Sequence, residues 1–264
     1  YSKRFKDTRT LYTIHNLKYQ GRFAKHLLPR SGLDWGEFKT AAADSLEFKD
    51  DINLMKAGIV YADASVTVSN RYSREILTPE FGCKLDGVLR VINEEGRLFG
   101  ILNGMDDSAC PATDEYVGNN YSMNNVLAVK PQNKQLLRQF VHDNRDIDKN
   151  GEPIEGRTPF GIPENPDSPM VVFIGRIVPQ KGLSILPEAA RLLLEWNPDL
   201  QIVITGPGSK ADFPEEIAAL ERVQEDYPTR AAAMVTKRFM IADNGEILGA
   251  KIYAGDVCMI PSTF

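Results

Sequence analysis

The strongest constraint in this sequence is the regular alternation, from residue 171 onward, of short apolar runs with amphipathic stretches of helical period. The expected strands are 171–174, 201–205, 232–235 and 257–260, and the expected helices are 183–196, 213–225 and 241–253. Strands that alternate with helices predict an α/β fold, in which a parallel sheet is covered by helices on both faces. Ligands of such sheets bind beyond the carboxyl ends of the strands, so functional residues are expected along that edge.

The first half of the chain shows a less regular version of the same pattern, with short apolar runs between polar turns. Strands are expected at 10–14, 64–69 and 98–102, and helices at 50–59, 71–77 and 134–140. Asn70 stands where its side chain can cap the helix at 71–77. Residues 142–168 are rich in proline, glycine and charge, and are expected to form a long surface connection.

The loop 175–182, with the sequence GRIVPQKG, follows an expected strand and precedes an expected helix whose apolar face is Leu183, Leu186, Ala190 and Leu194. Arg176 and Lys181 stand at the two ends of this loop. Lys181 is expected where the helix begins, so that its ammonium and the free N–H groups of the helix face the same anion. Such a site suits a diphosphate. The alternative is a solvated surface loop that happens to carry two cations.

Composition and charge exclude several other classes of protein. The formal net charge of −5 gives no electrostatic support for binding nucleic acid. The three cysteines, Cys83, Cys110 and Cys258, are far apart and odd in number, which argues against a zinc site or a disulfide framework and favours a reducing compartment. No apolar run approaches the length of a membrane span, and no signal-peptide pattern is present.

A series of short motifs, spread in order over nearly the whole chain, resembles the glycogen synthases and the bacterial and plastid starch synthases. The motifs are TIHN at 13–16, YQG at 19–21, LMKAG at 54–58, YAD at 61–63, VS at 68–69, YSREI at 72–76, TPEFG at 78–82, DG at 86–87, ILNGMD at 101–106, PATD at 111–114, NK at 133–134, GR at 175–176, QKG at 180–182, and Asp256 followed by PS at 261–262. Each motif alone is weak evidence, but their shared order is specific.

The resemblance implies an α/β fold of the GT-B type, with two facing Rossmann-like domains that are both incomplete in this chain. Residues 1–100 would be the C-terminal part of the N-terminal, acceptor-side domain. Residues 101–264 would be the nucleotide-sugar-binding domain, truncated at its C-terminal end. The implied reaction transfers glucose from a nucleotide diphosphate glucose, with ADP-glucose favoured, to the non-reducing end of an α-1,4-glucan with retention. Neither metal nor cofactor is implied, nor a nucleic-acid or membrane partner, and the implied location is the cytoplasm or a plastid.

The resemblance also implies the residues that carry the chemistry. Arg176 and Lys181 would stabilise the growing charge of the leaving nucleoside diphosphate, as Mg²⁺ does in other enzymes. His15 would line the sugar pocket near the reacting carbon. Without the resemblance, a single histidine after a strand is more often a structural residue.

Three further residues are candidates for substrate binding. Asn103 would contact the glucosyl group from the domain junction, and Asn16 and Gly206 would also contribute to the substrate site. Taken alone, Asn103-Gly104 is simply a turn. Gly206-Pro-Gly208 alone is a poor dinucleotide-binding signal, because the GxGxxG order and the later acidic residue are both missing.

The sequence also departs from the family's pattern. It has no Lys-x-Gly-Gly loop, and it stops at Phe264, where the family continues from Pro-Ser-x-Phe into Glu-Pro-Cys-Gly with the catalytic glutamate. The chain is therefore expected to be an internal fragment that cannot transfer glucose by itself. Cys83-Lys84 replaces the usual Tyr-Gly, and the stretch near Asn244 lacks the usual tyrosine, so nucleotide preference and acceptor contacts stay open.

Residues 143–158 are expected to be an insertion, and part of it imitates a calcium site. Residues 146–151 match the first half of an EF-hand loop. The twelfth position of that loop is Arg157 instead of a bidentate glutamate, and Pro153 interrupts its second half. Calcium binding is therefore not expected.

Two other functions remain as alternatives. A non-catalytic protein that binds glucans or nucleotide sugars could use the same fold, and the residues after Phe264 would distinguish it, because Glu-Pro-Cys-Gly supports the enzyme. A nicotinamide-dependent oxidoreductase is suggested only by the alternating strands and helices, and the missing glycine fingerprint argues against it.

Overall fold

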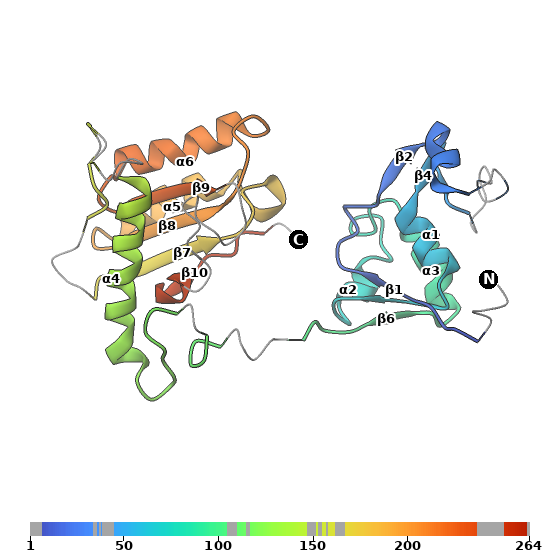
Figure 1. The fold of residues 1–264 in the computed structure, drawn as a ribbon, viewed down its shortest axis with the longest axis horizontal. Helices are drawn as coiled ribbons and strands as arrows, with labels where there is room; N and C mark the ends of the chain where they lie inside the picture. The colour runs from blue at the N-terminus through green and yellow to red at the C-terminus, as the bar shows by residue number, and fades with distance from the viewer. Residues whose placement is uncertain are drawn as a thin grey trace. The chain divides into compact units, whose positions relative to one another are not determined.

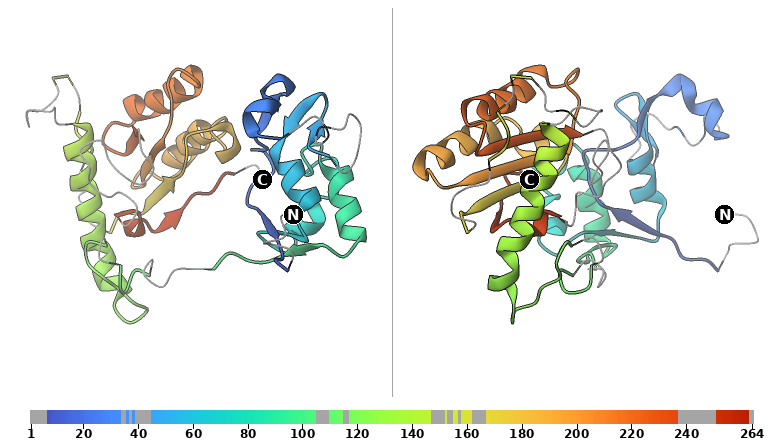
Figure 2. Two further views of the ribbon diagram at one scale, coloured as in Figure 1. Left: turned by 45° about the vertical axis from the view of Figure 1, so that its right-hand side comes forward. Right: turned by 60° about the vertical axis from the view of Figure 1, so that its left-hand side comes forward.

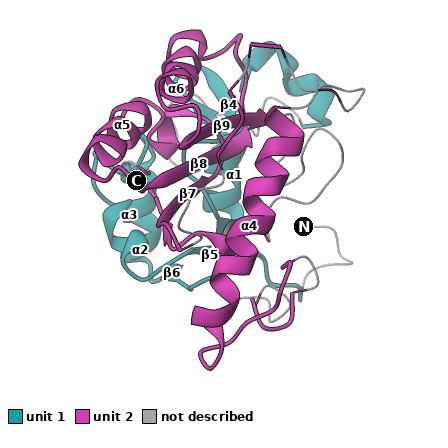
Figure 3. Cartoon of the chain, turned by 90° about the vertical axis from the view of Figure 1, so that its left-hand side faces the viewer, with its two compact units in different colours: residues 1–105 teal, residues 106–264 magenta. Residues whose placement is uncertain are grey.

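The computed structural model describes residues 7–33, 36, 38, 45–104, 110–114, 117–146, 152, 155–156, 158–161, 167–236 and 251–262. The chain forms two compact units, Tyr1–Met105 and Asp106–Phe264, which Figure 3 shows in different colours. Each unit contains its own parallel sheet with helices packed against it, so the predicted α/β class is confirmed. Among the described residues, no helix is both long and apolar enough to cross a membrane.

The first unit is built on a three-stranded parallel sheet in the order β1-β5-β6. Its strands are β1 (Leu11–Ile14), β5 (Ala64–Thr67) and β6 (Leu98–Gly100). The register places Leu11 opposite Ala64 and Ser65 opposite Leu98. A small antiparallel sheet in the order β2-β4-β3, which the sequence pattern did not predict, joins β2 (Arg22–Ala24), β4 (Asp51–Asn53) and β3 (Glu47–Phe48), and a 3-10 helix covers Lys25–Ser31.

The helices of the first unit are α1 (Leu54–Tyr61), α2 (Tyr72–Glu75) and α3 (Asp86–Glu94). The prediction of one helix over 50–59 is wrong, because β4 occupies Asp51–Asn53 and Asn53 caps α1 by accepting a hydrogen bond from Lys56 N at 2.9 Å. The expected cap at Asn70 is also wrong, since Ser69 Oγ accepts the bond from Tyr72 N at 2.9 Å.

The first unit has one main core between its parallel sheet and its helices. Its most buried members come from β1, α1, α3 and the segments between elements: Ile14, Leu17, Ile59, Ile76, Leu85 and Leu89. Helix α1 approaches β1 so closely that a side chain at Gly58 would overlap the ring of Tyr12. This contact gives the glycine of the LMKAG motif a packing role, and burial raises the pKa of Tyr12.

Asp63 fastens the start of β1 to the turn before β5. Its carboxylate accepts hydrogen bonds from Thr10 N at 2.7 Å and Thr10 Oγ1 at 2.9 Å, and it pairs with Arg9 Nη1 at 3.0 Å. These bonds, with the Thr10 amide first, hold the pKa of Asp63 below its usual value of 3.8.

The Asp63 bonds predict a pH-dependent effect on stability. A carboxyl group with a lowered folded-state pKa stabilises the protein above its unfolded pKa, and the effect is lost as pH falls through the folded pKa. We expect Asp63→Asn to lower the thermal midpoint at neutral pH, and we expect this difference to shrink below the usual aspartate pKa. Thermal unfolding at several pH values, with the exposed Asp7→Asn as control, would contradict the assignment if Asp63→Asn were neutral throughout.

The second unit is built on a four-stranded parallel sheet in the order β10-β7-β8-β9 (Figure 1). The strands are β7 (Met170–Ile174), β8 (Gln201–Pro207), β9 (Ala231–Thr236) and β10 (Val257–Cys258). The register places Val171 opposite Ile202, and Ile202 opposite Ala231. All of the expected strands in this half are therefore present, with ends that shift by one or two residues.

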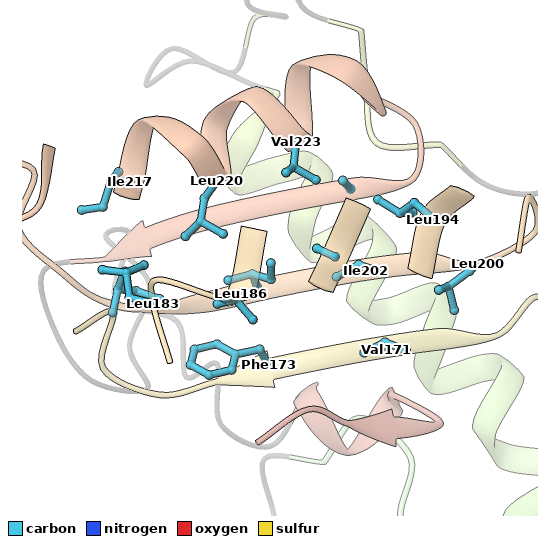
Figure 4. Packing of buried hydrophobic residues seen from close by; sticks show 14 residues of the cluster. Val171, Phe173, Leu183, Leu186, Leu194, Leu200, Ile202, Ile217, Leu220 and Val223 are labelled. Carbon is cyan, nitrogen blue, oxygen red and sulfur yellow. The ribbon is translucent and has the colours of Figure 1, made fainter. Parts of the chain in front are cut away.

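Helices cover both faces of this sheet, as the alternation predicted (Figure 2). On one face, α5 (Leu186–Trp196) and α6 (Pro214–Asp226) pack on strand residues such as Phe173 and Ile202 (Figure 4). On the other face, α4 (Val126–Arg145) packs through Leu137 and Phe140 on Val172 and Val203. Successive strand residues point to opposite faces, which is why neighbouring positions belong to different clusters.

The helix boundaries of this half differ from the predictions. Helix α4 is far longer than the expected 134–140, and α5 begins at Leu186 instead of residue 183. The four apolar positions expected on one face are nevertheless all buried: Leu183, Leu186, Ala190 and Leu194. Of the expected helix at 241–253, residues 241–250 lie outside the described residues, and Lys251–Ala254 form a 3-10 helix.

The expected surface connection at 142–168 is partly buried. Helix α4 continues to Arg145, whose guanidinium donates to Ala231 O at 3.0 Å and Thr158 O at 2.8 Å. Asp146 pairs with Arg145 and accepts a hydrogen bond from Phe160 N at 2.8 Å. The first carboxylate of the EF-hand-like stretch is therefore used inside the fold, while residues 148, 150, 151 and 157 lie outside the described residues.

Candidate functional site

The candidate site in the second unit lies at the carboxyl edge of its sheet. Gly175-Arg176 and Pro261-Ser262 follow β7 and β10, and Gly206-Pro-Gly208 spans the last residues of β8 and the first residue after it. Because the four strands are parallel, their carboxyl ends meet at one edge, where ligands of open α/β sheets bind. The structure therefore brings together the three loops that the sequence placed at this edge.

Gly206 allows two of these loops to approach each other closely. Its φ is 155°, a conformation that L side chains rarely adopt, and a Cβ at this position would overlap the carbonyl oxygen of Gly175. Gly175 N donates to Thr205 O at 3.2 Å, and Ile177 N donates to Pro207 O at 2.8 Å. The backbone beyond β7 thus stays paired with β8. Gly206 has this structural reason to be glycine, and its part in substrate binding stays a prediction.

Lys181 does not stand at a helix start, so that prediction is wrong. It closes the 3-10 helix η4 (Pro179–Lys181), and Gly182 then turns the chain with a φ of 80°. The amides around it bond within the loop: Lys181 N to Val178 O at 2.9 Å, and Leu186 N to Gly182 O at 3.0 Å. The first turn of α5 begins later and carries an acidic residue, Glu188. An anion at Lys181 would therefore meet the ammonium group without support from these amides.

The loop of Lys181 rests against the chain that follows β10. A Cβ at Gly182 would overlap the Pro261 carbonyl oxygen and would lie 2.8 Å from Pro261 Cβ. Only glycine therefore allows this approach without a shift of the backbone. The contact places the 261–262 segment beside the cation-bearing loop.

Both cations of this loop lie at the surface. The side chains of Arg176 and Lys181 are both exposed. No carboxylate in the described part of the chain pairs with the Lys181 ammonium. An exposed guanidinium and an exposed ammonium on one short loop suit a ligand with two or more negative charges.

In the first unit, the candidate residues also lie at the carboxyl edge of the sheet. His15 and Asn16 directly follow β1, and Asn103 follows β6. Since β5 lies between these strands, their backbones are about 9.5 Å apart at two strand spacings. His15 and Asn103 are exposed, while Asn16 is half-buried and its Oδ1 accepts a hydrogen bond from Lys18 N at 2.9 Å.

The six predicted site residues therefore fall into two groups, one in each unit. His15, Asn16 and Asn103 belong to the first unit, and the second unit contains the others, Arg176, Lys181 and Gly206. Within each unit the candidates share the carboxyl edge of one parallel sheet.

Several motif residues have structural roles that the sequence did not reveal. Gln20 Nε2 donates to Cys83 O at 2.9 Å, and Gln20 Oε1 accepts from Asn53 Nδ2 at 2.7 Å. The buried Lys56 donates to Glu47 O at 2.6 Å. The two Gln20 bonds fix the loop after β1, and the Lys56 bond joins α1 to β3. No local pattern indicates them, because each joins residues that are distant in sequence.

Comparison with known proteins agrees with this arrangement. Residues 1–91 match the family model for the starch synthase catalytic domain, and residues 156–227 match the model for glycosyl transferases group 1. A glycogen synthase of Anaeromyxobacter sp. (strain Fw109-5) is 38% identical over 258 residues, which are 97% of this chain and 46% of the relative. A glycogen synthase of Thermotoga maritima is 37% identical over 262 residues, 98% of this chain and 46% of the relative. The chain thus spans about half the length of the curated relatives it matches.

A solved structure gives the same result. The catalytic domain of starch synthase IV from Arabidopsis thaliana, bound to ADP and acarbose, matches with a TM-score of 0.72 and 26% sequence identity. The match covers 97% of this chain and 46% of that chain. It confirms the predicted fold class, an α/β chain with two Rossmann-like units of the GT-B type.

Proposed function

The chain belongs to the glycogen and starch synthase family, and on that premise we propose that the whole protein is a retaining glucosyltransferase. It transfers glucose from a nucleotide diphosphate glucose to the non-reducing end of an α-1,4-glucan. The observation that carries this proposal is the alignment of glycogen synthases with 97–98% of the chain, including both of its sheet edges.

In this proposal residues 101–264, which include the whole second unit and the end of the first, form the domain that binds the nucleotide sugar. Arg176 and Lys181 face the diphosphate and stabilise the charge that grows on it as the glycosidic bond to phosphate breaks. The exposure of both cations and the glycine contacts that hold their loop support this role. Gly206 contributes by letting the backbone of the two loops meet at the same edge.

The first unit provides the acceptor side of the reaction. His15 lies near the reacting carbon of the sugar, and Asn16 and Asn103 bind the glucosyl group. Because Asn16 Oδ1 is already bonded to Lys18 N, its side-chain amide N–H groups are the part that remains to donate to a sugar hydroxyl.

ADP-glucose is the donor that we favour. The support comes from the starch synthase IV structure, which was solved with ADP and acarbose.

The three cysteines are exposed and free, in line with the reducing compartment expected from their number, the cytoplasm or a plastid.

The test is an assay of the full-length protein with labelled ADP-glucose or UDP-glucose. The acceptor is a maltooligosaccharide whose reducing end is blocked, so that elongation reports growth at the non-reducing end. We expect incorporation, faster from ADP-glucose, into a product that an α-1,4-specific glucosidase removes. Binding of both ligands without incorporation would instead favour the non-catalytic alternative, and failure to bind either would contradict both.

We also expect the reaction to be independent of divalent metal ions, because Arg176 and Lys181 supply the positive charge at the diphosphate. Treatment of the full-length enzyme with EDTA should leave kcat and KM unchanged. Initial rates before and after chelation, with Mg²⁺ and Ca²⁺ added back separately, provide the measurement. A large loss that one ion restores would show that a metal, and not these cations alone, stabilises the leaving group.

A further inference from the structure

Two lysines of α4, Lys130 and Lys134, hold the chain segment that leads to Pro261. We propose that they are positioning residues, which fix the 261–262 segment against the Lys181 loop from the opposite face of the sheet. The proposal rests on the proposed function, because that function makes the Lys181 loop the diphosphate site. It adds a role for residues that touch neither substrate.

Lys134 holds Asp256, the residue directly before β10. Its side chain is only 4% exposed, and its Nζ lies 3.1 Å from Asp256 Oδ2, from Asp167 O and from Ser168 O. Asp256 Oδ2 also accepts from Met170 N at 2.8 Å, and Asp256 N donates to Met170 O at 2.8 Å. Lys134 therefore ties the start of β10 to the start of β7 through a buried ammonium.

Lys130 lies one helical turn earlier on the same face of α4. Its Nζ donates to Tyr253 O at 2.6 Å and to Gly255 O, and Tyr121 Oη donates to the same Tyr253 carbonyl at 3.0 Å. Burial lowers the pKa of Lys130, while Asp256 acts in the opposite direction. The two lysines together satisfy backbone oxygens and one carboxylate over the stretch 253–256.

Between these lysines and the site, the segment is anchored by a short ladder with β7 and by the packing of Met259. Strand β10 has only two residues, and Val257 is 57% exposed and Ile260 77% exposed. The bond from Met259 N to Val172 O, at 2.8 Å, is the last ladder contact before Pro261. Met259 packs on the core and Ala254 is buried, but the exposed residues between them leave the α4 lysines as the main polar anchors of this strand.

Helix α4, which carries the two lysines, is firmly packed in the core. Helix α4 is anchored in the core through Leu137, Phe140 and Val141, which are at most 3% exposed. At the other end, Pro261 abuts Gly182, the residue after Lys181. A shift of 253–256 would therefore displace the short stretch 257–261, and with it the loop that carries the Lys181 ammonium.

The experiment uses the full-length protein with Lys134→Met and Lys130→Met, which keep much of the apolar stem and remove the ammonium. Hydrogen exchange is followed in peptides covering 251–262 and in peptides of β8 and β9. Binding of ADP and the steady-state constants are measured in parallel. The matched control is Arg222→Met, an exposed cation on α6 of the same unit.

We expect faster exchange confined to 251–262, weaker ADP binding, and a fall in kcat/KM that approaches roughly 10²-fold, the cost of misplacing a reacting group by about 1 Å. The control should change none of these. Unchanged protection of 251–262 in both lysine variants, or equal loss of protection in β8 and β9, would overturn the proposal.

Two outcomes need separate treatment. If Lys134→Met does not fold because Asp256 is left as an unpaired carboxylate, Lys130→Met decides by the same criteria, since its partners are uncharged carbonyl oxygens. If the wild-type protein binds no ADP, the proposed function fails. The exchange data then still decide whether the lysines position 251–262, so the two failures are distinguishable.

Discussion

Replacing Lys181 with alanine in the full-length protein should lower kcat by about 10²–10³-fold, which corresponds to roughly 2.7–4 kcal/mol of lost transition-state stabilisation. The ammonium is exposed and lies on the loop that meets both the β8 and β10 ends of the sheet edge. The nearby amides of Lys181, Gly182 and Leu186 are bonded inside the loop, so these three donors cannot replace the ammonium.

The fold should survive the change. Helix α5 begins at Leu186 and packs through Leu186, Ala190 and Leu194, none of which depends on the Lys181 side chain. A substitution at an exposed loop position typically changes stability by no more than about 0.5 kcal/mol. The thermal midpoint should therefore stay within about 2 °C of the wild type.

Lys181→Arg and Arg222→Ala make the test specific. Arginine keeps the charge but replaces a compact ammonium with a planar fork, so it should restore only part of the rate. Arg222→Ala removes an exposed cation of the same unit that lies on α6, outside the cation-bearing loop, and should leave kcat unchanged. An unchanged kcat in Lys181→Ala with an intact fold would remove the diphosphate role of this residue and the main support for the site.

The strands of the second unit were predictable because each is a continuous apolar run between turn residues, a pattern that suits strands buried on both faces, such as β7 and β8. The helix boundaries were less so. Leu183 is buried 3 residues before α5 begins, so it continues the apolar period of the helix although it lies in the preceding turn. In the same way, the buried Ile52 of β4 and the buried Met55 and Ile59 of α1 imitate one helical face.

The buried part of 142–168 was missed for a different reason. A single aromatic residue, Phe160, enters the core there, and its amide donates to Asp146. Asp146 pairs with Arg145, which also donates to carbonyl oxygens of distant segments. Bonds of this kind leave no periodic signal. Charged residues near proline and glycine are therefore read as surface, although Arg145 is only 5% exposed.

The candidate site was predictable as a set of residues at strand ends, but not as a set of contacts. Alternation of strands and helices does not reveal that β7 lies between β10 and β8. Only this order brings Gly206 against Gly175, and Gly182 against Pro261. The role of α4 in placing the 261–262 segment was equally hidden, since its lysines act over more than 120 residues of sequence.

The largest effect on stability is expected for Gly206→Ala. A φ of 155° is rarely open to an L residue, and such backbone strain costs on the order of 1–3 kcal/mol by itself. The new Cβ would also overlap the Gly175 carbonyl oxygen, which is backbone and cannot rotate away as a flexible side chain could. We expect the thermal midpoint of the second unit to fall by roughly 10 °C.

A matched variant separates strain from overlap. Gly156 in the same unit has a φ of 76°, and a Cβ there would meet nothing within 4 Å. Gly156→Ala should therefore show only the cost of the left-handed backbone, about 1–2 kcal/mol, and should leave ADP binding unchanged. Gly206→Ala should also weaken ADP binding at temperatures well below its thermal midpoint, where the variant is still folded. The reason is that displacing Gly175 moves the adjacent Arg176. The contrary outcome is that both alanine variants lower the midpoint equally and bind ADP normally. Gly206 would then be an ordinary turn glycine, and the position of Arg176 would not depend on the close approach of the β7 and β8 loops.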